Sequence, residues 1–456
     1  MSYQEFIARK AHSKIENGFK RSFAPRGMFD FQESLLDWAC ETGRSAVFAE
    51  CGMGKTLIEL AWAQNVVQQS NAHVLVLVPL AVAPQMIREA ERFGMTASRS
   101  LDGYLPSSAG IVVANYERLH HFNPNHFGGL VCDESSILKA FDGATRNSII
   151  EFSKKIRYRL LATATPAPND TLELGNSSEA LGHLGHQDML SRFFTNSAQS
   201  MSPISLATKF RLKPHAKVAF WQWVGSWARA VRRPSDLGFD DGPMTLPPIE
   251  YLVTEIKASK PRPGCLFVEP ARDLREQRAD RRQTIAARCE AVAEKSIGAD
   301  SFVAWCHLND EGDLLEKIVP GAIQVSGRDS DEEKEEKFEA FRIGQARALV
   351  TKSIVAGMGM NWQHCNRMSF FPSHSYEQLY QSVRRCWRYG QTRPVTVDIV
   401  TTDGEPNVLK NLQEKSSAAE SMFELMVRNM NEKTTVDAST YRPSEFAMPS
   451  WIGVSP

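Results

Sequence analysis

Short apolar runs alternate with helix-forming segments through the first third of the chain. The runs are residues 45–48, 74–78, 111–114, 130–132 and 160–162. Continuous apolar runs of this length are typical of strands that are buried on both faces of a parallel sheet. Because strands that alternate with helices form βαβ crossovers, the pattern predicts a mostly parallel sheet flanked by helices.

A second alternation of the same kind begins after residue 300. Its candidate strands are residues 301–306, 322–325, 346–351, 367–371 and 395–400, and a charged helix is expected at 331–343. A chain of 456 residues also exceeds what one hydrophobic core usually serves. We therefore expect an α/β protein with two lobes of similar architecture, of which only the first contains a phosphate-binding loop.

Changes in composition divide the chain into five parts. We expect an N-terminal arm at residues 1–24, a first lobe at 25–233, a hinge rich in Pro, Asp and Gly at 234–250, a second lobe at 251–403, and a helix and tail at 404–456. A helical, aromatic-rich insertion is expected within the first lobe, at about 170–230. The spacing of its tryptophans favours core or inter-lobe packing over base stacking. The amphipathic helix that ends near residue 430 is expected to brace the two lobes.

Composition narrows the class of protein. Lys plus Arg and Asp plus Glu both number 53, so the formal net charge is zero, and a nucleic-acid partner must be argued from local motifs. The eight cysteines are scattered without a C-x-x-C pair, which favours reduced thiols over disulfides or a zinc site. No apolar run approaches the ~18 residues of a membrane span. We expect a soluble cytoplasmic protein with no membrane partner.

The segment Ala-Glu-Cys-Gly-Met-Gly-Lys-Thr, residues 49–56, lies between a predicted strand and a predicted helix. Gly52 and Gly54 allow the backbone to approach an anion, the start of the helix supplies free N–H groups, and Lys55 adds a positive charge. The hydroxyl of Thr56 is a candidate ligand for Mg²⁺. The first residue of this segment is alanine where the strict motif has glycine, so a glycine-rich turn without a ligand is the alternative.

Two acidic residues follow the apolar run at 130–132. Asp133 and Glu134 lie at the carboxyl end of a strand, where ligands bind in open α/β sheets. In a P-loop enzyme one carboxylate at this place holds Mg²⁺ and a second orients the attacking water. We assign the metal to Asp133 and the water to Glu134. Thr163 and Thr165 end the next predicted strand and are candidates for a link between the metal site and the rest of the lobe.

Other candidate residues lie outside these segments. Gln32 precedes Lys55 by about two dozen residues, and an amide can both donate to and accept from adenine. Arg385 and Arg388 are predicted to project from one face of a helix, where a guanidinium can clamp a γ-phosphate. Six arginines between 272 and 288 lie on a predicted helix with acidic residues between them. A solvated, salt-bridged helix explains them at least as well as a phosphate-binding face.

The order of these motifs resembles that of superfamily 2 helicases and translocases, and within them the Swi2/Snf2-like group. Residues 163–169 resemble T-G-T-P-x-x-N, residues 231–233 with 246–248 resemble L-R-R…L-P-P, residues 355–363 resemble A-G-x-G-x-N-x-Q, and residues 381–391 resemble Q-x-x-x-R-x-x-R-x-G-Q. An alanine replaces the middle glycine of the first motif. The resemblance runs from about Gln32 to Gln391.

The resemblance implies two RecA-like lobes with ATP and Mg²⁺ in the cleft between them. It places ATP at Gln32, Gly52, Gly54, Lys55, Thr56, Gly359 and Asn361, the metal at Thr56 and Asp133, catalysis at Glu134, Arg385 and Arg388, and coupling to nucleic acid at Thr163, Thr165 and Gln381. It also implies a compact bacterial or phage motor that moves on duplex DNA as a monomer in the cytoplasm. Replication, repair or defence proteins are candidate partners.

Two alternative functions fit the same motifs. One is a helicase that separates the strands of DNA or RNA. The other belongs to a different class of protein, an ATP-gated nucleic-acid-binding switch that hydrolyses little ATP within a replication, repair or defence complex.

Overall fold

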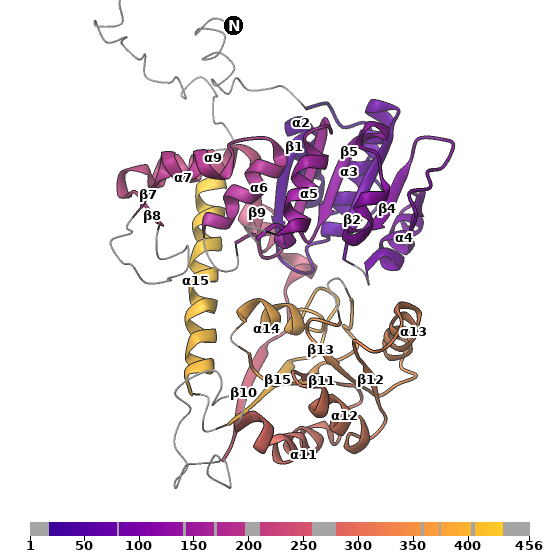
Figure 1. The fold of residues 1–456 in the computed structure, drawn as a ribbon, viewed down its shortest axis with the longest axis vertical. Coiled ribbons are helices and arrows are strands. Elements are labelled where there is room, and N and C mark those ends of the chain that lie inside the picture. The colour runs from indigo at the N-terminus through magenta and orange to yellow at the C-terminus, as the bar shows by residue number, and fades with distance from the viewer. Residues whose placement is uncertain are drawn as a thin grey trace, which may run out of the picture.

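The computed structural model describes residues 18–79, 82–139, 143–167, 171–196, 210–257, 280–356, 360–373, 375–402 and 406–431. Within them the chain forms two lobes that follow one another along the long axis of the molecule (Figure 1). Each lobe is built around one large sheet, and all strand pairings in these two sheets are parallel. The predicted α/β fold with two sheets flanked by helices is confirmed.

Several predicted segments lie outside the described residues. They are residues 1–17 of the arm, residues 168–169, Arg272, Arg275, Arg278, Gly359 and the tail from residue 432 onward.

The first lobe has a seven-stranded sheet in the order β3-β4-β2-β5-β6-β1-β9. Its strands are β1 (Arg44–Ala49), β2 (His73–Val78), β3 (Ala97–Arg99), β4 (Ile111–Asn115), β5 (Phe127–Asp133), β6 (Tyr158–Thr163) and β9 (Ala228–Val231). Its helices are α2 (Asp30–Thr42), α3 (Lys55–Ser70), α4 (Ala83–Arg92), α5 (Ala144–Ser153), α6 (Leu174–Leu181), α7 (His186–Phe193) and α9 (Lys217–Trp227). A short antiparallel pair, β7 (Phe194–Asn196) and β8 (Phe210–Leu212), lies beside the main sheet.

Alternate residues of each central strand pack on opposite faces of this sheet. In β2, Val74 and Val76 join a core cluster with α2, α3 and α4, whereas Leu75 and Leu77 join a cluster with α5, α6, α7 and α9. Side chains that alternate between two buried faces must all be apolar. This is why the strand appears in the sequence as one uninterrupted apolar run.

The second lobe has a six-stranded sheet in the order β10-β15-β14-β11-β13-β12. Its strands are β10 (Ile249–Ile256), β11 (Phe302–Cys306), β12 (Ala322–Val325), β13 (Ala348–Lys352), β14 (Arg367–Phe370) and β15 (Val395–Thr402). Its helices are α11 (Ile285–Ser296), α12 (Asn309–Ile318), α13 (Asp331–Arg342) and α14 (Tyr376–Val383), and α15 (Pro406–Asn431) follows β15. Short 3₁₀ turns at Pro234–Leu237 and Gly242–Met244 lie on the connection between the lobes.

Five described strands were not recognised in the sequence: β3, β7, β8, β9 and β10. β9 follows directly on the tryptophan-rich helix α9 and pairs with β1, so it completes the sheet beside the phosphate loop. β10 begins inside the segment expected to be the hinge and pairs with β15 along its whole length. As an edge strand it leaves Tyr251 and Val253 exposed, and it therefore lacks the apolar pattern of a buried strand.

The aromatic residues of the insertion form part of the first core. Phe220, Trp221 and Trp227 are buried and pack with Phe193 and Phe194, in agreement with the expectation of core packing.

Of the three described arginines near α11, Arg281 and Arg288 are buried and Arg282 is exposed. Arg288 is 2% exposed, forms an ion pair with Glu311 at 2.7 Å and stacks on Phe371, and Arg281 donates to the Pro372 carbonyl at 2.8 Å. Arg281 and Arg288 thus stabilise the interior of the second lobe. Neither of the two alternatives, a solvated helix or a phosphate-binding face, describes these two residues.

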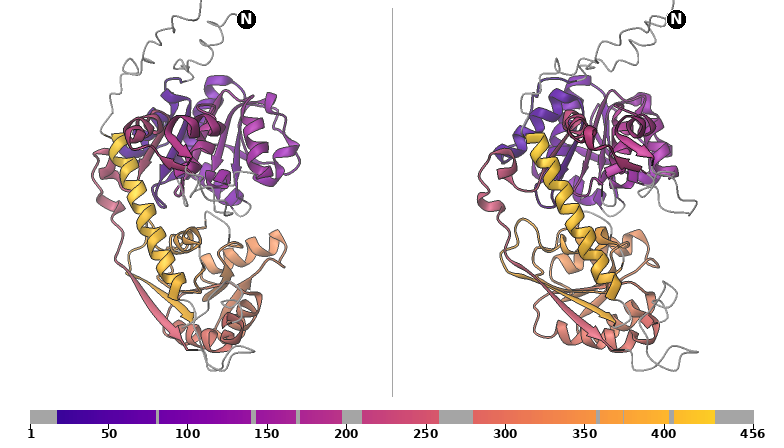
Figure 2. Two further views of the ribbon diagram at one scale, coloured as in Figure 1. Left: turned by 60° about the vertical axis from the view of Figure 1, so that its left-hand side comes forward. Right: turned by 90° about the vertical axis from the view of Figure 1, so that its left-hand side faces the viewer.

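Helix α15 crosses from the second lobe to the first. Both views in Figure 2 show it running along the two lobes as one continuous helix. Leu409, near its start, packs against the core of the second lobe, whereas Phe423, Met426 and Met430 belong to the core of the first lobe. The last strand of one lobe therefore leads into a helix that completes the hydrophobic core of the other.

The helices of the protein are relevant to membrane insertion, and its cysteines are relevant to disulfide bonding. None of the helices in the described residues is long and apolar enough to cross a membrane. The seven cysteines in the same residues are free thiols, and six of them lie in the hydrophobic clusters of the two lobes.

The packing of α15 can be tested by replacing Met426 with alanine. Met426 is fully buried against the first lobe, so Met426→Ala should lower the free energy of unfolding by about 2–5 kcal/mol through loss of contacts and a cavity. Urea unfolding followed by circular dichroism measures the change. Lys410→Ala, at an exposed position of the same helix, should have an effect below about 0.5 kcal/mol. Equal stability of the two variants would contradict the proposed packing.

Candidate nucleotide site between the two lobes

The phosphate loop connects β1 to α3 at the carboxyl edge of the first sheet. Gly52 and Gly54 have φ angles of +93° and +77°, which glycine adopts without strain. Because α3 begins at Lys55, its first N–H groups have no acceptor within the helix. The Lys55 ammonium donates to the carbonyl oxygens of Ala49 at 2.7 Å and Glu50 at 3.3 Å and so holds the loop in its curved shape. The loop has the backbone and charge of an anion site.

The side chain of Gln32, on α2, forms a hydrogen bond with this loop. Its side-chain amide donates to the Met53 carbonyl at 3.0 Å and accepts from the Phe29 N–H at 3.0 Å. A Cβ at Gly54 would lie 2.2 Å from the Gln32 nitrogen, so the glycine is also required by this contact. The amide retains one N–H and one lone pair, and contact with adenine therefore stays a prediction.

Glu134 of the acidic pair is held by hydroxyl groups at and after the ends of β5 and β6. Glu134 has a left-handed backbone with φ +52°, which is uncommon for a residue other than glycine. Its carboxylate accepts hydrogen bonds from Ser136 at 2.9 Å, Thr163 at 2.7 Å and Thr165 at 3.4 Å. The backbone N–H of Thr165 in turn donates to the Thr163 hydroxyl at 3.0 Å. Glu134 and the pair Thr163 and Thr165, which the sequence placed in two separate motifs, thus form one network.

Asp133 lies beside a carboxyl group that sequence reasoning missed. Burial, and next the neighbouring Glu134, raise the pKa of Asp133 to about 6. Glu59, on α3 one turn after Lys55, is 1% exposed, and burial followed by the Asp133 carboxylate raises its pKa well above the ordinary value. The available signal was a single glutamate within the apolar sequence of residues 57–63.

The arginine pair of the second lobe lies against the phosphate loop, but not on a helix. α14 ends at Val383, and the following residues form turns. The Arg385 carbonyl accepts from the Trp362 N–H at 2.9 Å, a contact with a neighbouring loop that replaces the next helical hydrogen bond. The prediction that both arginines share a helix face is therefore wrong.

Both arginines are nevertheless close to the first lobe. A Cβ at Gly52 would lie 2.9 Å from the Tyr389 nitrogen and 3.6 Å from the Arg388 Cβ. Burial lowers the pKa of Arg385 to about 10. The next largest effect on this pKa comes from Cys51 of the phosphate loop, so the two residues are close together. Arg388 donates to the Met360 carbonyl at 3.4 Å, and its Nε is buried without a hydrogen-bond partner among the described residues.

Direct polar contacts also join the phosphate loop to the second lobe. Glu50 forms an ion pair with Arg384 at 2.8 Å and accepts a hydrogen bond from the Tyr380 hydroxyl. No role was predicted from the sequence for Glu50, Arg384 or Tyr380. Glu50 nevertheless lies within the loop motif, and Arg384 directly precedes the arginine pair. A change in the shape of the loop would therefore move the lobes relative to each other.

Two further ion pairs join the lobes. Lys139 of the first lobe forms an ion pair with Glu377 of α14, and Arg99 forms one with Glu335 of α13 at 3.4 Å. Gln381, a predicted coupling residue, donates to Glu377 at 3.5 Å and so lies one helical turn from the Lys139 contact.

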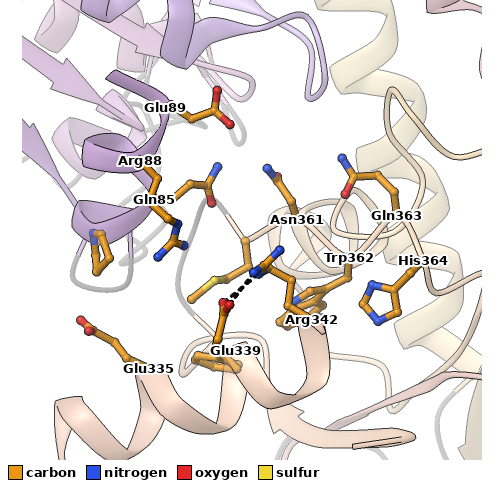
Figure 3. Close-up of a pocket in the computed structure, with 13 residues that line it drawn as sticks. Gln85, Arg88, Glu89, Glu335, Glu339, Arg342, Asn361, Trp362, Gln363 and His364 are labelled. Carbon is orange, nitrogen blue, oxygen red and sulfur yellow. Dashed lines mark hydrogen bonds and ion pairs between the residues drawn. The ribbon is translucent and has the colours of Figure 1, made fainter. Parts of the chain in front are cut away.

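A cavity of about 650 Å³ opens between the lobes and is lined by residues outside the phosphate loop. Figure 3 shows Gln85, Arg88 and Glu89 of α4 on one side and Asn361, Gln363 and Arg342 on the other. Its lining is polar and mixed in charge, because Glu89, Glu335 and Glu339 accompany Arg88 and Arg342. The Asn361 side-chain oxygen is buried without a hydrogen-bond partner in the described part of the chain. The structure thus places this predicted ATP ligand at the cavity, not at the loop of residues 49–56.

Comparison with known proteins agrees with this architecture. Residues 1–168 match the family described as Type III restriction enzyme, res subunit. No curated protein sequence matches the chain. Among solved structures, S. cerevisiae Dbp5 bound to RNA and ADP BeF3 is similar, with a TM-score of 0.55 and 10% identity over 94% of this chain and 96% of that chain. S. cerevisiae Dbp5 bound to Gle1 and IP6 has a TM-score of 0.51 and 11% identity over 87% and 92%.

The fold is that of a two-lobed helicase. Together with the match of the first lobe, it confirms the prediction of a superfamily 2 helicase-type ATPase with two RecA-like lobes. The assignment to the Swi2/Snf2-like group and to a bacterial or phage type stays a prediction.

The contact between the loop and the second lobe can be tested at Gly52. Gly52→Ala adds a Cβ that must push the Tyr389 backbone away, so the lobes should separate and the radius of gyration in small-angle scattering should increase. Gly94→Ala is the matched control, because Gly94 also has a positive φ of +71° but has open space around its Cβ position. Both variants should lose about 1–2 kcal/mol of stability from backbone strain. An unchanged radius for Gly52→Ala would contradict the contact.

The pKa of Asp133 predicts a pH dependence of stability without nucleotide or Mg²⁺. Because the folded state binds a proton at Asp133 more tightly than the unfolded chain, this group stabilises the fold below its ordinary pKa of 3.8, and the stabilisation is lost as pH rises to about 6. The variant Asp133→Asn lacks this titratable group and therefore lacks its pH-dependent contribution to stability. Between those pH values, wild type should lose up to about 1.4 kcal/mol per pH unit relative to the variant in urea unfolding. Parallel pH profiles would contradict the raised pKa.

Proposed function

We propose that this chain is an ATP- and Mg²⁺-dependent motor that moves along duplex DNA. The observation that carries the proposal is the meeting of the phosphate loop, the Asp133–Glu134 pair and the Arg385–Arg388 pair from two different lobes. A site assembled from two lobes is complete only when they are together. Binding and hydrolysis of a nucleotide in it would therefore be coupled to lobe movement.

The proposed roles follow from the position of each group. Lys55 and the N–H groups at the start of α3 bind phosphate, and Thr56 and Asp133 hold Mg²⁺. Bound there, the ion would neutralise charge on the phosphates. Mg²⁺ typically takes phosphate and water as its remaining ligands at such sites. Gln32 supports the loop and contacts adenine.

The reaction is attack of water on the γ-phosphorus of ATP, which breaks the bond to the β–γ bridging oxygen and releases ADP and phosphate. Glu134, fixed by three hydroxyl donors, orients the water and accepts its proton. Arg385 and Arg388 approach from the second lobe and stabilise the charge that develops on the transferred group. Thr163 and Thr165, at and just after the end of β6, donate hydrogen bonds to Glu134. Loss of the γ-phosphate would therefore change this hydrogen-bond network. Gln381 would carry this change within the second lobe.

The cavity of Figure 3 is the proposed place where nucleic acid crosses the lobe boundary. Its amide side chains can pair with base edges or sugar hydroxyls, and Arg88 and Arg342 can contact phosphates. Because α4 and α13 belong to different lobes, opening and closing would change the spacing of these contacts and step the strand. We further propose a monomer of bacterial or phage type, in the cytoplasm, with replication, repair or defence partners, on the sequence resemblance alone.

An RNA helicase is the second candidate, and the similarity to Dbp5 bound to RNA favours it. The mixed charge of the cavity, with no excess of basic residues, also fits a partner held partly through its bases and sugars.

The experiment is steady-state ATP turnover alone, with duplex DNA and with single-stranded RNA. We expect duplex DNA to raise kcat at least about tenfold, equivalent to about 1.4 kcal/mol of barrier, and the protein to displace the third strand of a DNA triplex without unwinding a forked duplex. Stimulation by RNA with unwinding would replace the proposal by the second candidate. Absence of stimulation by either would favour an ATP-gated switch.

Three variants serve as controls within the same experiment. Lys55→Ala should abolish binding of ATP, and Glu134→Gln should bind ATP but not hydrolyse it. Arg388→Ala should lower kcat by roughly 10³-fold with nearly unchanged ATP affinity.

A further inference from the structure

The buried carboxyl of Glu59 has the Asp133 carboxyl as its close polar neighbour on the described residues. The side chain lies on α3, one helical turn after Lys55, among the buried residues Leu60 and Trp62. It is 1% exposed, and neither carboxyl oxygen receives a hydrogen bond from any described residue. A buried carboxyl group without a donor is costly. Such a group is expected where something else supplies the missing hydrogen bonds.

The nearby polar groups are already used. The Lys55 ammonium is directed to the carbonyls of Ala49 and Glu50 and forms no ion pair with Glu59 in the described part of the protein. The Tyr116 hydroxyl donates to the Asp133 backbone carbonyl at 2.6 Å. The remaining neighbour is the Asp133 carboxyl itself, which is also an acceptor when ionised. The carboxyl groups of Glu59 and Asp133 therefore lie next to each other, and no further donor among the described residues reaches Glu59.

We propose that Glu59 is an outer-sphere residue of the Mg²⁺ site, which accepts hydrogen bonds from water on the metal and fixes the orientation of the Asp133 carboxylate. The proposal rests on the proposed function of this site. Mg²⁺ keeps several waters when it binds to proteins, and each such water presents two donors. Outer-sphere partners of this kind orient the direct ligands and tune metal affinity. Glu59 is thus a positioning residue, since it acts through Asp133 and water.

Two features of the fold favour this role over simple core filling. α3 packs against β5, so the position one turn after Lys55 faces the strand end that carries Asp133. A leucine at position 59 would match the apolar neighbours, yet the chain has an acid there.

The test is the Mg²⁺ dependence of nucleotide binding, with a fluorescent ATP analogue in the full chain. In wild type, Mg²⁺ should strengthen binding with a measurable midpoint concentration. Glu59→Leu should raise that midpoint by about 10–100-fold, while affinity in EDTA stays the same. Glu59→Gln keeps an acceptor oxygen and the size of the side chain, so its midpoint should lie between those of wild type and Glu59→Leu.

Asn65→Leu is the matched control. Asn65 is a fully buried polar residue of the same helix, and its amide hydrogen-bonds Phe23 and Ala61, far along α3 from the loop. This variant should lose thermal stability and leave the Mg²⁺ midpoint unchanged. A wild-type midpoint in both Glu59 variants would overturn the inference and leave the proposed function standing. If Glu59→Leu does not fold, the Glu59→Gln midpoint alone decides. Absence of any Mg²⁺ effect in wild type would overturn the proposed function, and the inference with it.

Discussion

The contact between the phosphate loop and the turn after α14 is the constraint on which the site depends. Glu50 and Arg384 form an ion pair across it, and Gly52 leaves room for the Tyr389 backbone. Both partners are only partly exposed, so the ion pair is less screened by solvent than the surface pair between Arg99 and Glu335. The loop that binds phosphate is therefore also the surface on which the second lobe rests.

Much of the fold could be predicted because its central strands are buried on both faces. The apolar runs of β2, β4 and β5 appear directly in the sequence, and the chemistry at their carboxyl ends follows from the parallel topology. β10 could not be found in this way, because an exposed edge strand has no core to dictate its residues. β9 was hidden by the adjoining apolar helix, since both segments pack in one core.

The candidate site was predictable where a motif fixes local geometry and not where distant segments meet. Lys55 and the acidic pair follow from residues close together in the sequence. Glu59 could be seen only as a glutamate in an apolar helix, and its contact with Asp133 depends on the packing of α3 against β5. The turn that carries Arg385 was read as helix because the capture of its carbonyl by the Trp362 N–H is a tertiary contact, which no local pattern reveals.

The course of α15 has a consequence for how the protein is made. A ribosome releases residues in order, and domains generally fold as they emerge. Here Met426 and Met430, which complete the core around Phe220, are synthesised only after the entire second lobe. Until then the newly made first lobe presents an uncovered apolar surface, a natural target for chaperones. The two lobes must consequently mature together, even though each has a sheet of its own.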